Sequence, residues 1–182
     1  MMAGVAAWGQ AAASLPEKPV SLDVAVIYNA SQANIVPGNN FWLQGGSLQI
    51  HAPLWHGWGA VADIAGLHTA NMHGKGVGLD LVTFTFGPRY TWAAPRCRYA
   101  FFGQFLAGQA QGSNSAFPGP GAVNSSATSL AFKLGGGVNV RIKHGFSIRA
   151  IEADWLRTQL PNATTGAQNN LGLGAGVIFN IK

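Results

Sequence analysis

The sequence has few charged residues, a single cysteine and no long apolar run. Its 182 residues include 11 Lys and Arg and 6 Asp and Glu, so charged residues make up 9% of the chain, whereas soluble domains have about 25%. The single cysteine, Cys97, excludes a disulfide framework and a cysteine-based zinc site. Glycine, proline, amides or charges interrupt every apolar run before it reaches the roughly 18 residues of a membrane-spanning helix. A helical membrane protein is therefore not expected.

The net charge of +5 reflects a shortage of carboxylates rather than a cluster of cations. The closest group of cations is Arg89, Arg96 and Arg98, whereas a phosphate-binding surface needs several Lys or Arg on one face. We therefore expect no nucleic-acid partner. Hydrophobic residues make up 48% of the chain, which is enough apolar surface to form one folded domain rather than a disordered chain.

Residues 1–19 differ in composition from the rest of the chain. They are small and apolar as far as Ala13, and Ala11-Ala12-Ala13 resembles the small-residue cleavage site of a secretory signal. No Lys or Arg precedes this apolar part, so a disordered leader is the alternative. We expect residues 1–19 to be a signal-peptide remnant and lead-in, and residues 20–182 to form the folded domain.

From Val20 onward, apolar and polar residues alternate with a period of two, which is typical of β-strands. The alternation between Ser129 and Ile142 is longer than a usual strand of about 5–6 residues, but it suits a tilted strand that crosses a bilayer. The connections alternate between long and short, as in an up-and-down transmembrane barrel. Eight strands are predicted, at residues 20–29, 40–52, 58–68, 77–90, 99–110, 127–142, 146–158 and 168–181.

The apolar side of each predicted strand is expected to face lipid. The other side has Gly, Ser, Thr, Gln and Asn with isolated ions, which is too few charges for the water-exposed surface of a soluble barrel. Phe84, Phe132 and Leu173 should therefore lie on the outside. A closed barrel also satisfies its backbone hydrogen bonds without water, as lipid requires. The sequence thus predicts an all-β fold, an eight-stranded antiparallel up-and-down transmembrane β-barrel over residues 20–182.

Aromatic residues cluster at the ends of the predicted strands. This placement predicts two girdles, one at each membrane–water interface. The expected girdle residues are Trp42, Trp55, Trp58, Tyr90, Trp92, Tyr99, Trp155 and Phe179.

Several segments resemble the outer membrane protein A-like β-barrel domain family, and the resemblance extends over residues 20–182. These segments are Gly59–Gly66, Phe84–Tyr90, Ser147–Trp155 and the closing Gly172–Phe179, which is similar to the family's assembly signal. Gly172 stands where that signal usually begins with a polar residue. The resemblance implies a protein of the bacterial outer membrane that contacts its lipids and the barrel-insertion machinery, and we expect a monomer. The wall-anchoring role of family members with a peptidoglycan-binding domain is not implied.

Charged residues on the inward side are expected to fill the lumen, because a barrel of eight strands has little room beyond its side chains. Arg149 and Glu152 are three residues apart, so they can both point inward only if a β-bulge lies near Ala150 and Ile151. A narrow small-solute pore is the alternative, since inward glycines could leave water-sized gaps. The expected interior polar network consists of Asp23, Asp63, Arg89, Lys133, Arg141, Arg149, Glu152 and Asp154.

No catalytic, cofactor-binding or metal-binding residues are expected. His68 and His73 are candidate bases for a lipid-modifying enzyme, but a serine nucleophile also needs an orienting carboxylate, and Asp80 is the only acid near that rim. No His-x-His or Glu-x-x-His spacing supports a metal site. Cys97 lies between two arginines, where a reactive thiol or an incidental turn residue would fit. We therefore predict a non-enzymatic outer-membrane protein with a plugged interior and a structural or surface-interaction role.

Overall fold

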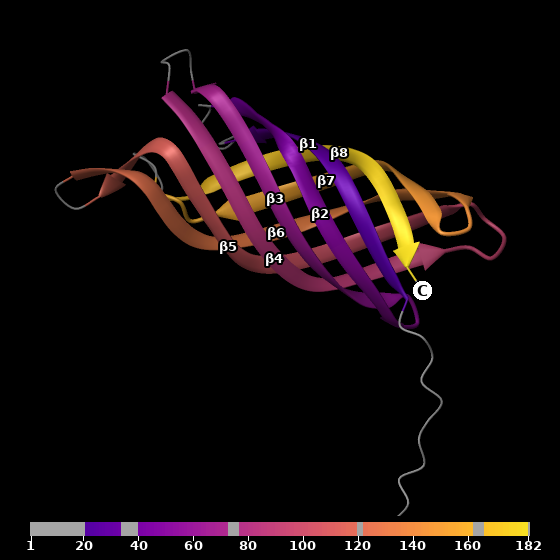
Figure 1. Ribbon diagram of the computed structural model, residues 1–182. Coiled ribbons are helices and arrows are strands. Elements are labelled where there is room, and N and C mark those ends of the chain that lie inside the picture. The colour runs from indigo at the N-terminus through magenta and orange to yellow at the C-terminus, as the bar shows by residue number, and fades with distance from the viewer. Residues whose placement is uncertain (1–20, 34–39, 73–76, 120–121, 162–165, 182) are drawn as a thin grey trace, which may run out of the picture.

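The computed structural model describes residues 21–33, 40–72, 77–119, 122–161 and 166–181. These residues form eight antiparallel strands, each hydrogen-bonded to the next, and β1 also pairs with β8, so the sheet closes into a barrel (Figure 1). None of the described residues lies in a helix long and apolar enough to cross a membrane. The strands are β1 (Leu22–Ala33), β2 (Phe41–Trp55), β3 (Trp58–Met72), β4 (Val77–Ala93), β5 (Tyr99–Gly119), β6 (Ala122–Lys143), β7 (Phe146–Thr158) and β8 (Gln168–Ile181).

The predicted all-β fold and the order of its strands are confirmed, and β7 and β8 have the predicted bounds. β5 and β6 are longer than predicted, because their pairing continues to Gly119 and Ala122 and forms a hairpin that extends past its neighbours (Figure 1). Residues 112–116 are Gly, Ser, Asn and Ala, a composition typical of loops. The strand is irregular there, with a register shift between Ser113 and Phe117 and a φ of 56° at Asn114.

The outer surface around the middle of the barrel is apolar. Phe84, Phe132 and Leu173 face outward, with 52%, 37% and 54% of their surface exposed. The predicted outward direction of these side chains is therefore confirmed. We call this surface the apolar band, and it includes one exposed apolar residue or more from every strand: Val26, Leu48, Ile64, Phe84, Phe105, Phe132, Ile151 and Leu173.

The polarity of the two faces reverses above the apolar band, towards the long-loop end. On β3, His68 is exposed while the preceding Leu67 is buried in the lumen. On β4, Asp80 contacts His68 on the outer face while Leu79 and Leu81 on either side of it are buried. The expectation of one orientation along whole strands is therefore wrong at this end, where the barrel is apolar inside and polar outside as in water-soluble proteins.

The buried apolar side chains at this end form a cluster that fills the lumen. We call this cluster the leucine-rich lid. It consists of Ala33, Phe41, Leu43, Leu67, Leu79, Leu81, Ala110, Phe117, Ala131, Leu156 and Leu160.

Candidate functional site

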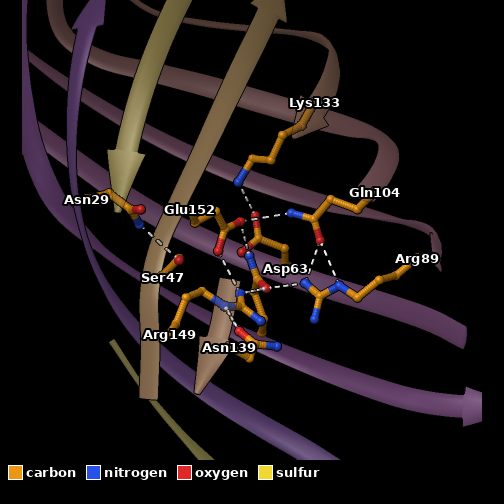
Figure 2. Close-up of polar contacts among 10 residues, drawn as sticks. Asn29, Ser47, Asp63, Arg89, Gln104, Lys133, Asn139, Arg149 and Glu152 are labelled. Atoms are coloured by element: carbon orange, nitrogen blue, oxygen red, sulfur yellow. Dashed lines mark hydrogen bonds and ion pairs between the residues drawn. The ribbon is translucent and has the colours of Figure 1, made fainter. Parts of the chain in front are cut away.

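The middle of the lumen, at the level of the apolar band, is filled by an ion network (Figure 2). Arg149 Nη1 donates to Glu152 Oε2 over 2.6 Å, and both side chains are 1% exposed. Lys133 Nζ donates to Asp63 Oδ2, and this pair is also buried. Two ion pairs of opposite charges thus lie side by side where lipid surrounds the barrel.

Two glutamines connect the ions to one another. Gln49 Nε2 and Gln104 Nε2 donate to Glu152 Oε1 over 2.9 and 2.8 Å. The two amide oxygens accept from Arg89 Nη2, each over 2.5 Å, and Gln49 Oε1 also accepts from Arg149 Nη1 over 2.5 Å. Each glutamine therefore offers its donor to a carboxylate and its acceptor to a guanidinium. Asp63 Oδ1 is buried without a hydrogen-bond partner among the described residues.

Phe102 forms the apolar side of the network. The guanidinium carbons of Arg89 and Arg149 lie 4.5 and 4.4 Å from the centroid of its ring. Both distances are within cation–π range. The ring thus stabilises two like charges from one side, while Glu152 and the amide oxygens face them from the others.

A β-bulge in β7 brings Arg149 and Glu152 to the same side of the sheet. Arg149 pairs with Gly176 and Glu152 with Gly174, so three steps along β7 match two along β8. The pairing with β6 shifts at the same place, between Val138 and Asn139. The predicted bulge near Ala150 and Ile151 is confirmed, and it explains how residues three apart both enter the lumen.

Asp154 lies above this network, at its edge. Its Oδ1 is buried without a hydrogen-bond partner among the described residues, as is Thr83 Oγ1. Both residues line a small cavity of about 30 Å³, together with Lys133 and Asn29. A water needs roughly 10–15 Å³ and two or more polar partners, so the cavity can hold an ordered water that satisfies both oxygens.

Asp23 and Arg141 lie below the network, at the short-turn end. Asp23 Oδ2 is 3.0 Å from His51 Nδ1, and Asp23 Oδ1 accepts from Asn180 Nδ2 over 2.6 Å. Arg141 is exposed and lines an open cavity at this end. Five of the eight predicted interior residues lie together in the buried network: Asp63, Arg89, Lys133, Arg149 and Glu152. Asp154 lies beside them. Asp23 and Arg141 lie apart from the network, at the short-turn end of the barrel.

His68, one of the two candidate bases of an enzyme, lies on the outer face of the barrel, above the apolar band. His68 Nδ1 is 2.5 Å from Asp80 Oδ1, and Asn114 Nδ2 donates to Asp80 Oδ2. Among the described residues, no serine hydroxyl forms a hydrogen bond with His68. His73 lies outside the described residues. The His68–Asp80 dyad therefore has an orienting carboxylate but no serine nucleophile bonded to it in the described residues. It connects β3, β4 and β5 on the outer face.

The predicted girdle residues all lie on the outer surface of the barrel, each at least 38% exposed. Two pairs form tilted ring contacts at the short-turn end, where the ring centroids of Trp58 and Tyr90 lie 5.1 Å apart and those of Phe146 and Phe179 lie 5.7 Å apart. Cys97 is exposed in the turn between β4 and β5. The described part of the chain has no group of three or more His, Cys, Asp or Glu that could hold a metal ion.

Sequence reasoning missed the neutral members of the network. Gln49, Gln104 and Phe102 are buried, yet they are not ions and so were not among the predicted interior residues. The strand period does place Gln104 and Phe102 on one face of β5, opposite the exposed Phe101 and Phe105. Glutamine side chains on the inward face of a predicted strand, near predicted inward ions, are therefore the sequence pattern that would have predicted these residues.

The chain was compared with known proteins, and no protein-family model and no curated protein matches it. Solved structures do match. The Neisserial surface protein A structure is 12% identical, with a TM-score of 0.66, over 88% of this chain and 97% of that one. Ail, the attachment invasion locus protein of Yersinia pestis, in complex with the heparin analogue sucrose octasulfate, is 16% identical with a TM-score of 0.56, over 88% and 99%.

The N-terminal β-barrel domain of Pseudomonas aeruginosa OprF is 15% identical, with a TM-score of 0.50, over 87% of this chain and 97% of that one. All three are eight-stranded outer-membrane barrels of the outer membrane protein A-like class. The chain therefore has the fold of that class, an antiparallel up-and-down ring of eight strands.

Proposed function

We propose that the chain is a monomeric, integral protein of the bacterial outer membrane, non-enzymatic and closed to solutes, with a structural or surface-interaction role. The observation that supports this most directly is the reversal of side-chain polarity along the barrel. The apolar band around the middle suits hydrocarbon, and the polar network inside it replaces water there. Above the band, polar residues face outward and the leucine-rich lid fills the lumen, which suits a segment surrounded by water.

The orientation follows from the connections. Outer-membrane barrels have short periplasmic turns and longer external loops. His56-Gly57 joins β2 to β3 and His144-Gly145 joins β6 to β7, and β1 begins and β8 ends at the same end (Figure 1). We assign this short-turn end to the periplasm and the opposite end, with the β5–β6 hairpin, to the cell exterior. The expected contacts are outer-membrane lipids around the band and the insertion machinery at β8.

The exterior surface is polar but nearly neutral in the part that the structure describes. In the described part of the chain, Arg157 is the only Lys or Arg above the apolar band. Ail has been crystallised with a heparin analogue, which is a polyanion, but the described residues of this chain offer no comparable group of cations at that end. Neutral polar and apolar contacts, above all on the extended β5–β6 hairpin, would therefore recognise a surface partner.

A narrow pore and a lipid-modifying enzyme are less well supported. The leucine-rich lid and the ion network lie one above the other, so a solute would have to pass both. The His68–Asp80 dyad lacks a neighbouring nucleophile in the described residues, and acyl transfer by a dyad of this kind needs one. Measurements of conduction and of lipid turnover test these two functions.

The test combines location, folding and conduction. The protein, expressed in a Gram-negative host, should be recovered in the outer-membrane fraction and should migrate differently on a detergent gel before and after heating. In planar bilayers it should give no steady unitary conductance. Lipid turnover with the unchanged protein should equal that of a membrane without the protein. Replacing His68 by Ala should not change it. A soluble, unshifted protein, steady channels, or lipid turnover lost with His68 would each contradict the proposal.

A further inference from the structure

An open cavity lies inside the ring of strands at the short-turn end of the barrel. It has a volume of about 390 Å³ and adjoins a second cavity of about 330 Å³, with which it shares Asp23, Thr91 and Asn139. We call the two together the vestibule. Arg89 lines the second cavity, so the buried ion network forms the inner wall of the vestibule and separates it from the rest of the lumen.

The vestibule has an excess of positive charge. Arg98, Arg141 and Lys143 line the larger cavity, and a backbone hydrogen bond of 2.8 Å from Arg141 N to Arg98 O brings two of these cations to adjacent positions. Among the described residues, the only acid that lines either cavity is Asp23. Its two carboxylate oxygens are already engaged by His51 and Asn180. The three cations therefore line a space in which the described part of the chain offers no unengaged carboxylate.

Neutral donors complete the lining. The side chains of Asn139, Asn180 and Ser147 border the larger cavity beside the cations. Guanidinium, ammonium, amide and hydroxyl groups are all hydrogen-bond donors to an anion. Concave walls of low polarity also focus the field of charges that line a cleft. The vestibule is thus built to attract an anion from the aqueous side.

We propose that the vestibule binds a small, phosphate-bearing anion with more than one negative charge. Each exposed cation alone contributes little binding free energy, so retention requires several of them to act on one compact ligand. A diphosphate group places several charges within the reach of Arg98, Arg141 and Lys143, and guanidinium groups bind its oxygens in pairs. The site goes beyond the proposed structural role and does not depend on it.

The ligand is a soluble anion rather than a lipid headgroup. Arg141 and Asn139 have the opposite parity in β6 to Ile142, which faces outward, and both line the larger cavity, so these two polar side chains point into the ring and away from the bilayer. The wall formed by Arg89 closes the far side. An anion that enters from the short-turn end is therefore held there and is not transported.

The only cysteine of the chain offers a direct reporter, because Cys97 is exposed and lines the larger cavity. The protein, folded in neutral micelles, is treated with thiol-specific methanethiosulfonates that have either a sulfonate or a trimethylammonium group. We expect the anionic reagent to react about tenfold faster, relative to its rate with a free thiol, than the cationic reagent. Pyrophosphate should slow the anionic reagent several-fold, and NaCl of equal ionic strength should slow it much less.

A matched pair of variants locates the effect. The double variant Arg98→Gln and Arg141→Gln should lose most of the charge preference and the protection by pyrophosphate. Arg157→Gln removes an arginine at the opposite end of the barrel and should change neither. The heat-dependent gel shift verifies that each variant is folded, independently of the binding result.

Several outcomes would overturn the proposal. They are equal rates for the two reagents, protection by NaCl as strong as by pyrophosphate, and the same loss in Arg157→Gln as in the double variant. Protection by citrate but not by pyrophosphate would assign the site to carboxylates instead. Protection by nanodiscs with phosphatidylglycerol, without any effect of pyrophosphate, would assign it to a lipid headgroup. All these results are distinct from failure of the barrel to fold or to reach the membrane.

Discussion

At the scale of single residues, the most constrained position in the lumen is Phe102. Two guanidinium groups lie against its ring at 4.5 and 4.4 Å, and like charges so close together repel one another. Glu152 and the oxygens of Gln49 and Gln104 offset that repulsion, because each accepts a hydrogen bond from one of the arginines. Glu152 is the only carboxylate that bonds directly to either arginine in the described network.

Replacement of Glu152 by Gln should therefore destabilise the barrel strongly. The substitution keeps the size of the side chain but removes its charge, so Arg149 and Arg89 are left buried without a carboxylate beside them. Loss of one partner of a buried ion pair costs about 3–5 kcal/mol. We expect the free energy of unfolding to fall by this order, measured by urea titration in detergent micelles with the heat-dependent gel shift as readout.

Asp80→Asn is the matched control, since it also neutralises one carboxylate of an ion pair. The His68–Asp80 pair is exposed to water, with 63% and 32% of the two side chains accessible, and such pairs are screened. The urea midpoint of this variant should stay close to that of the unchanged protein. Equal losses in both variants would show that the buried network has no special part in stability.

The charged part of this site was predictable, and the neutral part was not. Strand parity placed Asp63 and Lys133 on the inward face, and the spacing of Arg149 and Glu152 indicated the bulge, because a regular strand cannot turn both inward. Parity alone does not say which ion pairs with which. The partners follow from the stagger of the strands around the ring, which brings Lys133 of β6 to Asp63 of β3, and no local pattern encodes that stagger.

At the scale of strands, close backbone approach explains several inward glycines. A Cβ atom placed on Gly45 of β2 would lie 1.9 Å from Gly66 O of β3, whereas a Cβ on Gly66 would meet nothing within 4 Å. The two glycines lie almost opposite one another on paired strands, but one points into the tightly curved ring and the other away from it. The close approach of the two strands therefore requires glycine at position 45 but not at position 66.

Gly45→Ala and Gly66→Ala should consequently differ in effect although they add the same methyl group. In the first variant, β2 and β3 must move apart, and overpacking of this kind costs about 1–3 kcal/mol. The second should leave the urea midpoint unchanged or raise it slightly. The comparison is made on the two variants refolded side by side. A loss of equal size in both would mean that the close approach of Gly45 to Gly66 O does not limit the packing of β2 against β3, since the entropy of the unfolded chain by itself makes Gly→Ala stabilising.

The strand boundaries show where local patterns stop being informative. The bounds of β7 and β8 were predictable because apolar residues alternate along most of each strand, apart from the bulge in β7. The end of β5 was not, since the serines, glycines and asparagine after Ala110 lack apolar alternation and the hairpin is closed by pairing with β6. The reversal of polarity was present in the sequence at Leu79-Asp80-Leu81, where the apolar residues change to the opposite parity from Val82 and Phe84.

At the scale of the whole molecule, the lumen has two barriers of different chemistry, one above the other. The ion network lies within the apolar band, and the leucine-rich lid lies above it. Paired ions can rearrange when water enters, whereas apolar side chains exclude water and ions together. Removal of one barrier should therefore leave the other closed.

Conduction should appear only when both barriers are weakened. Asp63→Asn with Lys133→Gln removes one ion pair without leaving an unpaired charge, and Leu79→Ser with Leu81→Ser makes the lid polar. Each double variant alone should remain silent in planar bilayers, while the four substitutions together should give steady unitary currents, provided that the heat-dependent gel shift verifies folding. Currents from the Asp63 and Lys133 variant alone would mean that the lid does not seal the barrel. Silence of the folded quadruple variant would place the barrier in other residues of the lumen, such as Arg89 and Phe102.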